Sequence, residues 1–67
     1  MNEIVKGWII SNIQEQLNEL AGAIDNEKLW MLGSTSFEEI AGHADIIKIL
    51  CEAMDYYNTQ LREIIEK

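Results

Sequence analysis

The C-terminal half of the chain carries residues at alternating steps of three and four, the spacing of a single stripe along an α-helix. The stripe consists of Ile40, His43, Ile47, Leu50, Met54, Tyr57, Leu61 and Ile64. Its repeat is that of a helix that packs lengthwise against another helix. Ser36 and Glu39 form a capping box before it, with Thr35 and Glu38 as an alternative one residue earlier. We therefore expect a long helix at about 36–66.

A second stripe with the same spacing occupies the N-terminal half. Its members are Ile10, Ile13, Leu17, Leu20 and Ile24, which predict a helix at about 3–25. Asp25 or Asn26 can cap a separate short helical turn at about 26–32, and Gly33 can end that turn in the left-handed conformation. The run 29–32 is apolar on all sides, so we expect it, with Trp30, to plug the end of the helix pair.

These patterns predict an all-α fold with one domain over residues 1–67, an antiparallel helical hairpin with a short helical connector. The chain has no proline and only four glycines, which favours uninterrupted helices. Hydrophobic residues make up 48% of the chain, too many for a disordered segment. We expect the chain to fold.

The apolar surface of the long helix is wider than one neighbour can cover. A second set of residues lies beside the main stripe: Ile46, Ile49, Ala53 and Tyr56. Together the two sets span roughly 200°, whereas a helix with one packing partner buries a stripe of about 100°. The first helix carries Val5, Ile9 and Ala23 beside its own stripe. We expect a homo-oligomer, most simply a homodimer forming a four-helix-type bundle. The alternative is a monomer in which the middle segment covers this face.

Twelve acidic against five basic residues give the chain a formal net charge of −7. This charge repels phosphate backbones and anionic membranes and attracts basic protein surfaces, so we expect a basic protein partner, no direct nucleic-acid binding and no membrane binding. Trp8 points away from the first stripe, towards Glu15 and Glu19, and these three residues are the candidate partner-binding site. The alternative for Trp8 is packing across a dimer or against the start of its helix.

Few residues are suited to chemistry. His43, the only histidine, lies on the stripe one turn after Glu39. The two are candidates for a pH-sensitive contact in the seam where the helices pack, or for half of a metal site. With no third ligand at a suitable spacing, we expect no metal, and no cofactor or catalytic residue either. Cys51 has no cysteine partner, so we expect a small buried residue in a reducing, cytoplasmic protein. The N-terminus has neither a basic nor a long apolar region, so we expect no signal peptide.

Small size, negative charge and a surplus of apolar surface are typical of small accessory proteins encoded by bacteria and their phages. We therefore expect an inhibitor or adaptor that binds a larger bacterial protein, and no enzyme activity. A purely structural self-assembly module is one alternative. A protein that imitates the charge of DNA is another, although Lys28, Lys48 and Arg62 interrupt the acidic surface.

Overall fold

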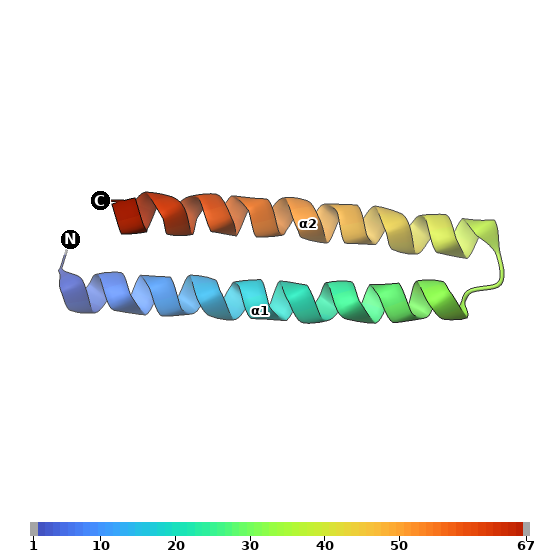
Figure 1. Ribbon diagram of the computed structural model, residues 1–67, viewed down its shortest axis with the longest axis horizontal. Coiled ribbons are helices and arrows are strands. Elements are labelled where there is room, and N and C mark those ends of the chain that lie inside the picture. The colour runs from blue at the N-terminus through green and yellow to red at the C-terminus, as the bar shows by residue number, and fades with distance from the viewer. Residues whose placement is uncertain (1, 67) are drawn as a thin grey trace.

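Two long helices joined by a tight loop make up the computed structural model, which describes residues 2–66. Helix α1 comprises Glu3–Gly33 and helix α2 comprises Phe37–Glu66. They run antiparallel and side by side, so the two ends of the chain lie together and the loop lies at the opposite end (Figure 1). The molecule measures 52 × 14 × 10 Å. The expected all-α helical hairpin is confirmed.

Side-chain caps fix the start of both helices. The Asn2 side chain accepts hydrogen bonds from the backbone N–H groups of Ile4 and Val5, at 2.8 and 3.4 Å. Ser36 Oγ accepts one from the backbone N–H of Glu39 at 3.1 Å, which is the serine half of the expected capping box. These three hydrogen bonds satisfy N–H groups that have no partner within the helix. The expected start of the first helix and the expected span of the second are thus confirmed.

The end of α1 differs from the expectation. A separate helical turn at 26–32 is wrong, because α1 continues without a break to Gly33. No proline interrupts this segment, and the three–four spacing of the stripe continues through Glu27 and Met31. Gly33 does not adopt the left-handed conformation. The helix ends at Ser34, whose backbone N–H and Oγ bond the carbonyls of Met31 and Trp30 at 3.2 and 2.8 Å.

The expected apolar plug at the end of the hairpin is also wrong. Leu29, Trp30 and Leu32 are 65%, 57% and 83% exposed. Because these residues belong to a continuous helix, their side chains point in different directions around it, and only Met31 of this run is half-buried. Phe37, at the start of α2, is 91% exposed. The loop end of the hairpin is therefore open and apolar.

The core is one thin seam between the helices. Every residue of the two predicted stripes is buried or half-buried, but among the described residues the only buried apolar side chains are Ile13 and Ile24, which are 6% and 8% exposed. The chain exposes 5208 Å², whereas a compact monomer of 7.7 kDa exposes about 4,300 Å². Its radius of gyration is 15.6 Å, against about 11 Å for a compact domain of this length. Neither helix is long and apolar enough to cross a membrane.

Replacing Gly22 by alanine should stabilise the protein. Gly22 lies inside α1 on its exposed side, and a Cβ added there meets nothing within 4 Å. Alanine is favoured over glycine in a helix interior by about 1 kcal/mol, and we expect urea unfolding to show a gain of that size. The same change at Gly7, near the frayed helix start, should gain less. A loss of stability in Gly22→Ala would indicate that this side of α1 is covered in solution.

Candidate interaction surfaces

The residues of the two stripes, which pack between the helices, are the seam positions. On one side of the hairpin lie the residues that immediately precede the seam positions of both helices. A groove on this side contains Ile9 and Gln16 from α1 together with Gln60 from α2, and these residues directly precede Ile10, Leu17 and Leu61. Residues with the same offset from the seam share that side. We call it the open face, and define it by Val5, Ile9, Ala23 and Trp30 of α1 and Ile46, Ile49, Ala53 and Tyr56 of α2.

The open face is not covered by the chain itself. Ile46, Ile49 and Tyr56 are 44%, 63% and 60% exposed, and Ala53 is half-buried. The middle segment that could have covered them is part of α1 and does not fold over this face. Tyr56 packs edge-on against Tyr57 with ring centroids 5.5 Å apart, and its hydroxyl accepts a 2.8 Å hydrogen bond from the side-chain amide of Gln60. The Tyr56 ring is therefore held in place while much of it stays open to contact.

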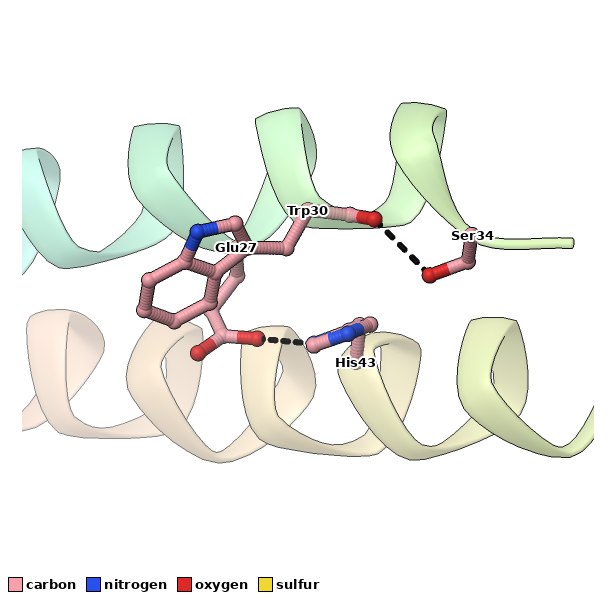
Figure 2. Close-up of polar contacts among 4 residues, drawn as sticks. All are labelled: Glu27, Trp30, Ser34 and His43. Atoms are coloured by element: carbon pink, nitrogen blue, oxygen red, sulfur yellow. Dashed lines mark hydrogen bonds and ion pairs between the residues drawn. The ribbon is translucent and has the colours of Figure 1, made fainter.

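A polar cluster bridges the helices near the loop end, at one edge of the open face. The Nδ1–H of His43 donates a 2.6 Å hydrogen bond to Oε2 of Glu27, and the two side chains point at one another across the seam (Figure 2). Glu27 is 8% exposed, and it is the one buried charged residue among those described. The Trp30 ring lies beside His43, with centroids 6.0 Å apart and planes tilted by 46°.

This cluster pairs His43 with a residue that the sequence did not suggest. Glu39 is exposed and lies one turn before His43 on the same helix, whereas Glu27 is 16 residues away in sequence and reaches His43 from α1. A signal for Glu27 was present, because it occupies the next seam position after Ile24. The interhelix hydrogen bond compensates for the burial of the Glu27 carboxylate, which would otherwise be costly.

The outer side of α1 presents a second apolar surface. Trp8 is 70% exposed and Ile4, one helical turn away, is 65% exposed. Glu15 and Glu19 are exposed on the same outer side of the helix, as their spacing from Trp8 predicts. The three candidate partner-binding residues are thus available to a partner together. We call this the Trp8 surface.

The remaining candidate groups are dispersed. Cys51 is exposed, so the expectation that it is buried is wrong; it lies beside the stripe on the side away from the open face. Among residues 2–66, no three His, Cys, Asp or Glu side chains gather as metal ligands would. Leu29, Leu32 and Phe37 are exposed at the loop end, and the first two belong to the segment that was expected to plug the helix pair.

Comparison with protein-family models, with curated proteins and with solved structures finds no match to this chain.

Substitutions at Glu27 and His43 test the polar cluster. We expect His43→Leu to lower the free energy of unfolding by about 1–3 kcal/mol, because it leaves the buried Glu27 carboxylate without its partner. Glu27→Leu should cost less, since the His43 side chain is 25% exposed and water can replace the lost bond. The double variant should recover at least the wild-type stability, because two leucines complete an apolar seam. Additive losses, measured by urea unfolding, would show that the two side chains do not depend on one another.

Proposed function

We propose that the chain is a protein-binding module that acts as a homodimer, in which the open faces of two copies pack together as a four-helix bundle. The observation that carries this proposal is the surface left uncovered by the hairpin. The chain exposes 5208 Å², about 900 Å² more than a compact monomer of its mass. A standard protein interface buries about 800 Å² on each partner, so one such contact removes the surplus.

The composition of the open face also supports self-association. Its α2 part consists of Ile46, Ile49, Ala53 and Tyr56 without a charged residue among them. Hydrophobic side chains at this density, more than 40% exposed at Ile46, Ile49 and Tyr56, are typical of an interface between subunits. In a symmetric dimer each of these residues is present twice in the interface, once from each copy.

Ile49→Asp should therefore dissociate the dimer. Burying an isoleucine side chain contributes about 1.5–3 kcal/mol, and the residue appears twice in the interface. We expect the dissociation constant to rise by about 100-fold or more. Sedimentation equilibrium at micromolar concentration should give twice the chain mass for the wild type and a smaller average mass for the variant.

Leu32→Asp is the matched control for this experiment. Leu32 is 83% exposed but lies outside the open face, so the same change of chemistry should leave the dimer mass unaltered. A wild-type protein that has the mass of one chain at every concentration and still unfolds cooperatively would contradict the proposed dimer.

We further propose that the partner is a larger, basic protein of a bacterial cell, which the module inhibits or recruits from the cytoplasm. Dimerisation through the open face leaves Trp8 and Glu15 available, while Glu19 lies at the edge of that face. An exposed tryptophan beside carboxylates suits a partner segment that carries both apolar and basic side chains. The net charge of −7 speeds association with such a segment at low salt. A phage or mobile-element origin fits this role.

Trp8→Ala and the charge-reversed variant Glu15→Lys/Glu19→Lys test the partner surface. We expect wild-type protein to retain a specific bacterial protein at low salt and to release it at high salt. Trp8→Ala should weaken that complex by about 30-fold, the usual effect of truncating a tryptophan at the centre of an interface. Trp8→Ala should still be a dimer. Identical retention by all three proteins would contradict a role for this surface.

The same pull-down distinguishes the two alternative functions. Recovery of the bait alone, by the wild type and both variants, would support a purely structural self-assembly module. A retained protein that DNA displaces would support mimicry of DNA charge. Lys28, Lys48 and Arg62 lie among the exposed acidic residues and weaken that second alternative.

A further inference from the structure

The hydrogen bond between Glu27 and His43 fixes the register of the hairpin. Residues of α1 and α2 whose numbers sum to about 70 lie at the same height along it, since 27 and 43 sum to 70. The α2 part of the open face runs from Ile46 to Tyr56 and is centred on position 51, within one residue of the midpoint of Phe37–Glu66. The corresponding height on α1 is position 19. The α2 part of the open face is therefore centred along the length of the hairpin. This position limits the ways in which a second copy can pack against it.

From this placement we infer that two copies pack with their loops at opposite ends, α2 against α2 and α1 against α1. The inference rests on the proposed dimer and specifies its geometry. A twofold axis perpendicular to the helices then places the α2 part of the open face against the same part of the second copy. Ile46 faces Tyr56 of the second copy, and Ile49 faces Ala53, so that a large residue meets a small one near the centre.

The apolar residues of α1 match in the same arrangement. Trp30 lies eleven positions after position 19, the central height of α1. It therefore lies opposite position 8 of α1 in the second copy. The open-face residues on either side of that height are Val5 and Ile9. Trp30 is 57% exposed and Val5 42%, so each has apolar surface for the other to cover. Gln16 lies opposite Ala23 of the second copy, and Glu19 lies nearest the axis, opposite Glu19 of the second copy, at the edge of the interface, where water reaches both carboxylates.

The opposite arrangement, with both loops at one end, mismatches these residues. It places α2 of one copy against α1 of the other at equal heights. Ile49 then faces Glu19, and Ala53 faces Gln16. Trp30 comes to the height of Glu39. Ile49 and Ala53 then lie opposite a carboxylate and an amide instead of opposite one another, so this arrangement covers less apolar surface with apolar surface.

Spin labels at the loop distinguish the two arrangements. Thr35 is exposed in the loop, so a single label on Thr35→Cys in a Cys51→Ser background reports the distance between the two loops. With loops at opposite ends, double electron–electron resonance should give a separation close to the 52 Å length of the hairpin. With loops at one end, the separation should not exceed the width of a bundle, about 20 Å.

A label on the native Cys51 is the matched control. Cys51 lies at mid-height, so its two labels should be separated by roughly the bundle width in either arrangement. A short distance at both positions would overturn the inferred orientation and leave the dimer intact. Absence of any dipolar coupling at both positions, together with a single-chain mass in sedimentation, would overturn the dimer itself.

Discussion

Two helices can shield only one stripe of each other, and this limit governs the whole molecule. In the part of the chain that the structure describes, the seam between α1 and α2 buries just two apolar side chains, Ile13 and Ile24, along a hairpin 52 Å long. A third layer that could cover the other faces is absent from the described chain. Apolar residues beside the seam therefore remain in contact with water until another molecule covers them. This uncovered apolar surface is the observation that supports the proposed role in association.

The Glu27–His43 hydrogen bond fixes which residues of α1 pack against which residues of α2. Repeated aliphatic residues at three–four spacing allow one helix to slide along the other by a heptad with little change in packing. A buried polar pair opposes such a shift, because displacement would separate two groups that satisfy each other. In this hairpin the pair also sits beside Trp30, at the edge of the open face, so the residues that set the hairpin register adjoin the proposed interface.

The apolar surfaces divide into two kinds of interaction. The open face combines residues of both helices, is centred on the molecule and carries no charge in its α2 part, which suits a second copy of the same chain. The Trp8 surface belongs to α1 alone and adjoins carboxylates, which suits a partner of opposite charge. The two surfaces adjoin at Glu19, and a second copy on the open face leaves Trp8 and Glu15 exposed.

Spacing and bonds between near neighbours were enough to predict the two helices, the seam between them and the Ser36 cap of α2. The residues of both stripes, the start of α1 and the span of α2 all follow from such local patterns. The extent of α1 did not, since the stripe continues through a glutamate, and a charged residue at a seam position looks like the end of a helix. Its partner lies 16 residues away, on the other helix.

Only the tertiary structure decided which apolar residues lie inside. Leu29, Leu32 and Cys51 are residue types that are usually buried, and composition places them in a core. The hairpin exposes them because a pair of straight helices has no second layer to receive them. The Trp8 surface could be predicted from a single helix, since it depends on α1 alone. The open face could not be predicted in full, because half of it comes from each helix and the antiparallel packing brings the halves together.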